Sequence, residues 1–162
     1  MFEQIYDMNL SQGKIKILDI VDTNRIKVLV ADAACKWQMG KELCSTSKSI
    51  NGSRNGNRGG SAPKSDTGII FSNYASAITE YTQALLLLQK MECTDTETLF
   101  AALCIKYRHL ELDWSFLEGM RVKHEDNTTP TYSEWKLLRL RLEMCISVLK
   151  EEVEKIEVVH QS

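Results

Sequence analysis

The chain has no long hydrophobic run. Its longest uninterrupted aliphatic segment, Ala84 to Leu88, is far shorter than the about 20 apolar residues that a membrane-spanning helix needs. Its first residues, Met1 to Asp7, contain neither the basic segment nor the apolar segment of a secretory signal. We therefore expect no membrane partner and a cytoplasmic location.

Paired cysteines are missing as well. The five cysteines are scattered, odd in number and without a C-x-x-C spacing, and the three histidines are not spaced to complete a zinc site. We interpret the cysteines as reduced thiols on mostly buried helix faces. We expect no metal ion and no cofactor.

Catalytic signatures are also absent. The glycines at 56–60 lack the G-K-[ST] ending of a phosphate-binding Walker loop, and no G-x-S-x-G elbow occurs. The neighbouring acids Glu151, Glu152 and Glu154 are most simply solvated side chains on a helix. The sequence therefore predicts that the protein is not an enzyme.

Neither positive nor negative charge is in large excess. With 20 basic and 22 acidic residues the net charge is −2, which argues against a strongly basic nucleic-acid-binding protein but allows a small reader with local positive charge. A chain of 162 residues with 43% hydrophobic and 26% charged residues is typical of one globular domain, or of a domain plus an arm.

Large apolar residues are almost missing from residues 45–66, which are rich in Ser, Gly and Asn. Such a segment cannot bury enough surface to order itself. We predict a flexible linker there, between an N-terminal helical arm (1–44) and a helical domain (67–162). The linker is either a solvated tether or a basic arm that touches nucleic acid. Its cations are Lys48, Arg54, Arg58 and Lys64.

Hydrophobic periodicity predicts an all-α fold. The last helix is expected to bury one stripe, formed by Trp135, Leu138, Leu142, Cys145 and Leu149. Residues 14–21 fit a strand or a short helix, and we favour a helix because no sheet partner is evident. Two capping boxes, at 94–97 and 131–134, mark helix starts. The expected helices span about 24–44, 67–92, 95–110, 113–122 and 132–159.

The segment from Thr94 to Lys150 has the layout of a helix-turn-helix with a preceding support helix. Such a unit needs two helices that cross steeply over a small apolar core, with the first turns of the second helix free to enter the major groove of DNA. Trp114 and Leu117 could form one side of that core, and Trp135 and Leu138 the other.

Basic residues lie near the start of the predicted reader helix. Lys136 and Arg139 are three residues apart and should project together; with Tyr132 they are candidates to read bases. The candidates for phosphate contact or support of docking are Arg121, Lys123 and Arg141. The alternative is that these cations form an ordinary solvated helix face and that the tryptophans only anchor a core.

The order of these features resembles the ArpU/RinA-type phage late-gene transcriptional regulators, whose C-terminal half is similar to region 4 of sigma factors. The resemblance covers roughly residues 24–150 and is one of layout more than identity. The segments that carry it are Ala62-Pro63-Lys64-Ser65-Asp66, Lys106-Tyr107-Arg108-His109-Leu110 and Asp113-Trp114-Ser115-Phe116-Leu117.

Two functional hypotheses follow. The resemblance implies a phage-type regulator that binds double-stranded DNA through its helix-turn-helix and acts on host RNA polymerase as activator or antiterminator, a pair of activities that phage Q-type antitermination proteins combine. The alternative is a non-enzymatic helical interaction or adaptor module. Its apolar stripe on the last helix, from Trp135 to Leu149, would then bury against a partner or a second copy.

Overall fold

The computed structural model describes residues 2–52, 64–93, 95–123 and 132–161, without the side chains of 46–52, 64–67, 119–123, 132–133 and 157–161. The described residues form six helices and two short strands. In chain order these are α1 (Phe2–Ser11), β1 (Ile15–Ile17), α2 (Thr23–Gly52), α3 (Lys64–Leu88), β2 (Met91–Cys93), α4 (Thr96–Lys106), α5 (Trp114–Lys123) and α6 (Tyr132–Gln161). The prediction of a mostly helical protein is confirmed.

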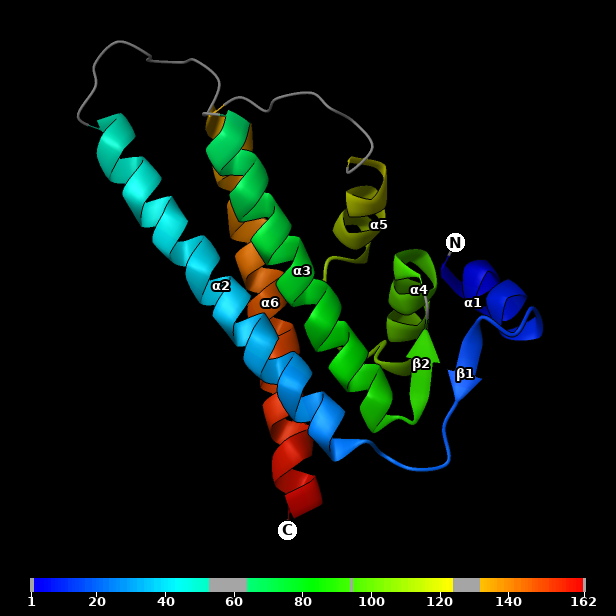
Figure 1. Ribbon diagram of the computed structural model, residues 1–162. Helices are drawn as coiled ribbons and strands as arrows, with labels where there is room; N and C mark the ends of the chain where they lie inside the picture. The colour runs from blue at the N-terminus through cyan, green and yellow to red at the C-terminus, as the bar shows by residue number, and fades with distance from the viewer. Residues whose placement is uncertain (1, 53–63, 94, 124–131, 162) are drawn as a thin grey trace.

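Three long helices, α2, α3 and α6, lie side by side, and α3 is in contact with both of the others (Figure 1). Five residues at helical spacing along α3 are almost completely buried: Ile70, Tyr74, Ile78, Tyr81 and Leu85. Its other sides are covered as well, with Ala77, Leu86 and Leu87 among the core residues. Because α3 contacts α2, α4 and α6 and contributes many of the buried side chains, it is the centre of the fold.

The small antiparallel sheet corrects the expectation of a helix at 14–21. Ile15 to Ile17 form β1, which pairs with Met91 to Cys93 of β2, so the sheet partner lies some 75 residues away in the chain. Gly13 (φ 74°) turns the chain from α1 into β1, and Lys90 (φ 60°) turns it from α3 into β2. Both residues adopt the left-handed conformation that commonly ends a helix.

Helix α1 packs against α4 beside this sheet, away from the long helices (Figure 1). The side-chain amide of buried Asn9 donates a hydrogen bond of 2.7 Å to the Thr98 hydroxyl. Asp95 is the N-cap of α4, since its carboxylate accepts the backbone N–H of Thr98 at 2.8 Å. The cap therefore lies one residue after Thr94, the predicted capping residue, which is outside the described residues.

Several side chains between residues 2 and 44, the described part of the predicted arm, belong to the main core. Phe2, Ile15, Ala33 and Cys44 belong to the same buried cluster as the side chains of α3, α4 and α6. Of the predicted linker, 45–52 belong to α2 and 64–66 to α3, and 53–63 lie outside the described residues. Helix α2 packs along α3 because its apolar residues, among them Ile26 and Ala33, meet the buried face of that helix.

Candidate functional site

The inner face of helix α6 is buried in the core of the protein. Trp135, Leu142, Cys145, Leu149 and Val153 are buried, and α6 packs against α3 through them. The periodicity of this stripe is thus confirmed. These residues fill the core of the protein and so are not open to a partner in this structure.

The opposite side of α6 carries a second apolar line. Leu137 and Leu140 are each 53% exposed and Met144 is 61% exposed. Their spacing of three and four residues places them above one another on the helix surface. We call these three side chains the α6 outer face. Our sequence prediction covers only the longer inner stripe, although the same spacing rule also indicates this second face.

A groove of about 760 Å³ runs beside the outer face. Leu140, Met144 and Val148 of α6 form part of its lining, together with Trp37 of α2 and Phe116 of α5. The groove therefore joins elements that are far apart in the sequence.

Cations cover both aromatic side chains of this groove. The Lys41 ammonium lies 3.9 Å from the centre of the Trp37 ring, and the Arg141 guanidinium 5.8 Å from that of Phe116. Such contacts stabilise a cation over an aromatic face by about 0.5–1 kcal/mol at exposed sites. Lys41 and Arg141 thus line the groove themselves, beside the exposed Leu140 and Met144.

Of the six predicted DNA-contacting residues, the structure describes the side chains of three. The side chains of Lys136 and Arg141 are exposed. The Arg139 side chain is only 22% exposed, with its Nε 3.9 Å from Oε1 of Glu143. Lys136 is thus open to solvent, whereas Arg139 is largely covered. The other three predicted side chains lie outside the described residues: Tyr132, Arg121 and Lys123.

A polar junction between α2, α3 and α6 explains the inward direction of Arg139. The Tyr74 hydroxyl donates a hydrogen bond of 2.9 Å to Glu143 Oε1 and lies 3.6 Å from the Cys44 sulfur. Burial raises the pKa of Tyr74, so the phenol stays protonated and acts as the donor. The guanidinium of Arg139 then balances the partly buried carboxylate of Glu143. This arrangement favours a structural role for both charged residues.

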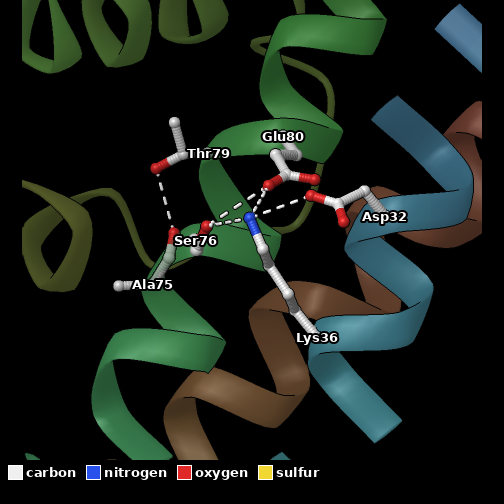
Figure 2. A network of polar contacts seen from close by, with 6 residues as sticks. All are labelled: Asp32, Lys36, Ala75, Ser76, Thr79 and Glu80. Carbon is white, nitrogen blue, oxygen red and sulfur yellow. Dashed lines mark hydrogen bonds and ion pairs between the residues drawn. The ribbon is translucent and has the colours of Figure 1, made fainter. Parts of the chain in front are cut away.

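Figure 2 shows a second polar network, between α2 and α3. The Lys36 ammonium forms ion pairs with Glu80 and with Asp32 (2.9 Å), and donates a hydrogen bond of 2.8 Å to the Ser76 hydroxyl. Only the pair Asp32 and Lys36, four residues apart on one helix, leaves a signal in the sequence. Glu80 and Ser76 join them through the tertiary fold alone.

The contact between Ser76 and Lys36 has the composition of a serine–lysine nucleophile pair. In such a pair a neutral lysine must take the proton of the serine hydroxyl. Here hydrogen bonds to Glu80 and Asp32 raise the pKa of Lys36, so the amine keeps its proton. The cluster therefore serves as an ion-pair junction that fixes α2 on α3 rather than as a nucleophile with its base.

Two of the buried cysteines are poor nucleophiles for a related reason. Burial raises the pKa of Cys93 to about 11 and that of Cys145 to about 12, so both thiols stay protonated at neutral pH. Within the described ranges no group of three His, Cys, Asp or Glu side chains could hold a metal ion. Among the helices of those ranges, none combines the length and apolar character needed to cross a lipid bilayer.

Comparison of the chain with protein-family models, with curated proteins and with solved structures gives no match. The geometry of the outer face and its groove is therefore the basis for a functional proposal.

Proposed function

We propose that the protein is a non-enzymatic helical interaction module that binds an amphipathic helix along the α6 outer face. The observation that carries this proposal is the exposure of Leu137, Leu140 and Met144 beside a groove that contains Trp37 and Phe116. Apolar anchors at spacings of three and four are how one helix engages another in a groove. A contiguous apolar patch of this kind commonly marks an interaction site.

The free energy that burial of the outer face can contribute is consistent with a specific but moderate association. Complete burial of a Leu or Met side chain contributes about 1.5–3 kcal/mol, and these three side chains are already about half buried. Docking then gains roughly 1 kcal/mol from each. Contacts with Trp37 and Phe116 must supply the rest, because association also loses translational and side-chain freedom.

The proposal is tested with a displayed library of amphipathic helical peptides, selected against the dilute wild-type protein. Peptides should be recovered whose binding is lost in Met144→Glu. The matched control is Val28→Glu, the same kind of change at an apolar residue of α2 that is 68% exposed. If every recovered peptide binds Met144→Glu as well as it binds wild type, the outer face is not the site.

DNA reading by α5 and α6, with action on host RNA polymerase, is the second candidate. The exposed cations Lys136 and Arg141 favour it, since both are available for phosphate. It requires the first turns of α6 to enter a groove of the duplex, with the half-buried Arg139 outside the base-reading set. A gel shift across salt concentrations checks this reading: Lys136→Ala should weaken binding uniformly across sequences and flatten the salt dependence. Salt-independent or absent binding would remove this candidate.

A further inference from the structure

The junction between α2 and α3 contains two carboxyl groups but only one ammonium. Lys36 forms ion pairs with Glu80 of α3 and with Asp32 of its own helix (Figure 2). The charged groups that act on Glu80 are these two, both from α2, and α3 adds the Ser76 hydroxyl. The junction therefore carries one negative charge more than Lys36 balances when both acids are ionised.

The two carboxyl oxygens of Glu80 have different surroundings. Oε1 accepts hydrogen bonds from Lys36 and, at 3.3 Å, from the Ser76 hydroxyl. Oε2 is buried and has no hydrogen-bond donor within the described part of the chain, and the side chain as a whole is only 10% exposed. A buried acceptor without a donor costs free energy, and more so when it is charged. Glu80 is therefore the acid of this junction that gains most from a proton.

Asp32 provides an acceptor for such a proton. Its carboxyl faces that of Glu80 beside the lysine (Figure 2), and its side chain is 50% exposed, so that water stabilises its charge. Hydrogen bonding with Glu80 lowers the pKa of Asp32. Burial raises the pKa of Glu80 despite Lys36, and the hydrogen bond with Asp32 adds to the rise. Two neighbouring carboxyls that differ in this way hold one proton between them.

We propose that Glu80 and Asp32 share a proton at mildly acidic pH, and that acidification thereby strengthens the contact between α2 and α3. The protonated Glu80 donates its O–H to the Asp32 carboxylate, which makes a charge-assisted hydrogen bond. Lys36 stays charged, because its hydrogen bonds with Glu80 and Asp32 raise the pKa of the ammonium, and it continues to pair with Asp32. Trp37, the next residue of α2, lines the groove. The proton therefore acts on a helix that forms one side of that groove, whether or not the groove binds a partner helix.

The pH dependence of unfolding tests the effect of this proton on stability. A carboxyl with a higher pKa in the folded than in the unfolded chain adds stability at low pH, and this stability is lost as the pH rises through the folded pKa. Glu80→Gln keeps the shape of the neutral carboxyl but cannot titrate. The urea midpoint of wild type should therefore rise relative to that of Glu80→Gln as the pH falls from about 7 to 5. Asp7→Asn, a change at an exposed acid of α1, is the matched control and should follow wild type.

The proton itself is followed by carbon-13 NMR titration of the carboxyl groups in the full-length wild-type protein. Glu80 should titrate with a midpoint above about 4.3, the value of an ordinary glutamate. Asp32→Asn, whose amide can donate to the ionised Glu80, should lower that midpoint. A Glu80 midpoint at or below about 4.3, or parallel urea midpoints of wild type and Glu80→Gln over this pH range, overturns the proposal. A raised midpoint that is unchanged in Asp32→Asn shows that burial alone holds the proton, and overturns the sharing.

Discussion

Replacing Gly40 of α2 by alanine is the most direct test of how α2 packs against α3. A Cβ atom on Gly40 would stand 2.4 Å from Cε1 and 2.7 Å from Cδ1 of the Tyr74 ring. Carbon atoms in contact normally remain about 3.5–4.0 Å apart, so alanine would require a displacement of about 1 Å. The Tyr74 ring is completely buried and its hydroxyl is bonded to Glu143, which leaves the ring little room to withdraw.

The expected cost follows from two opposing effects. In an ordinary helix interior, replacing glycine by alanine stabilises by about 0.8–1.0 kcal/mol. Overpacking of a well-packed core costs about 1–3 kcal/mol and occasionally more. Because this clash is between a helix backbone and a fixed ring, we expect the overpacking to exceed the gain. Gly40→Ala should lower the free energy of unfolding by about 1–2 kcal/mol.

The matched control is Gly68→Ala in α3, where an added Cβ would meet no atom within 4 Å. It should raise the free energy of unfolding by about 0.5–1 kcal/mol. Both variants are measured by urea unfolding followed by circular dichroism. In a Tyr74→Leu background, where the ring is gone, Gly40→Ala should cost little or stabilise. If Gly40→Ala and Gly68→Ala shift the unfolding midpoint equally, the close approach of α2 to Tyr74 is refuted.

Three further predictions concern buried polar contacts, each measured by urea unfolding. Lys36→Met should lower the free energy of unfolding by about 1–3 kcal/mol at pH 7, because Glu80 loses its counter-charge and its partial exposure to water moderates the cost. The double variant Lys36→Met/Glu80→Leu should recover most of the lost stability. Burial already raises the pKa of Glu80, and loss of the lysine raises that pKa further. In the Lys36→Met variant the Glu80 carboxyl then binds a proton more readily in the folded protein than in the unfolded chain, where its pKa is about 4.3. Lys36→Met should therefore gain stability relative to wild type as the pH falls from about 7 to 5. Parallel pH profiles of the two proteins would contradict this. Asp95→Ala removes the α4 cap and should cost about 1 kcal/mol, whereas Asp95→Asn should retain most of it. Tyr107→Phe deletes the hydrogen bond of 2.7 Å to the Leu85 carbonyl in the last turn of α3 and should cost about 1–2 kcal/mol, and a change below about 0.3 kcal/mol would mean that water replaces the hydroxyl.

The candidate site was visible in the sequence only in part. The spacing of Leu137, Leu140 and Met144 is as regular as that of the inner stripe, so the presence of two apolar faces on α6 could have been predicted. Which of them faces solvent could not, because that depends on the width of the surface that α3 offers. The positions of Trp37 and Phe116 beside the outer face were equally hidden, since they come from other helices.

Arg139 shows the same limit for a single side chain. Its spacing from Lys136 suggested a shared cationic surface, and on an isolated helix the two would be neighbours. The Arg139 side chain is instead largely covered, and its Nε lies 3.9 Å from Oε1 of Glu143, which also accepts the hydrogen bond of Tyr74. Tyr74 lies on α3, more than sixty residues earlier, and no signal in the sequence indicates that it meets this part of α6.

The amino-acid pattern by itself predicted the mostly helical fold, the approximate positions of the longer helices and the buried stripe of α6, because periodicity and helix signals act over a few turns. Tertiary structure alone decided the pairing of β1 with β2, the packing of residues 2–44 on the main core, the junction of Lys36 with Glu80, and the apolar face that α6 leaves in water. Each of these depends on which distant surfaces meet, and local spacing carries no information about a neighbour contributed by another part of the chain.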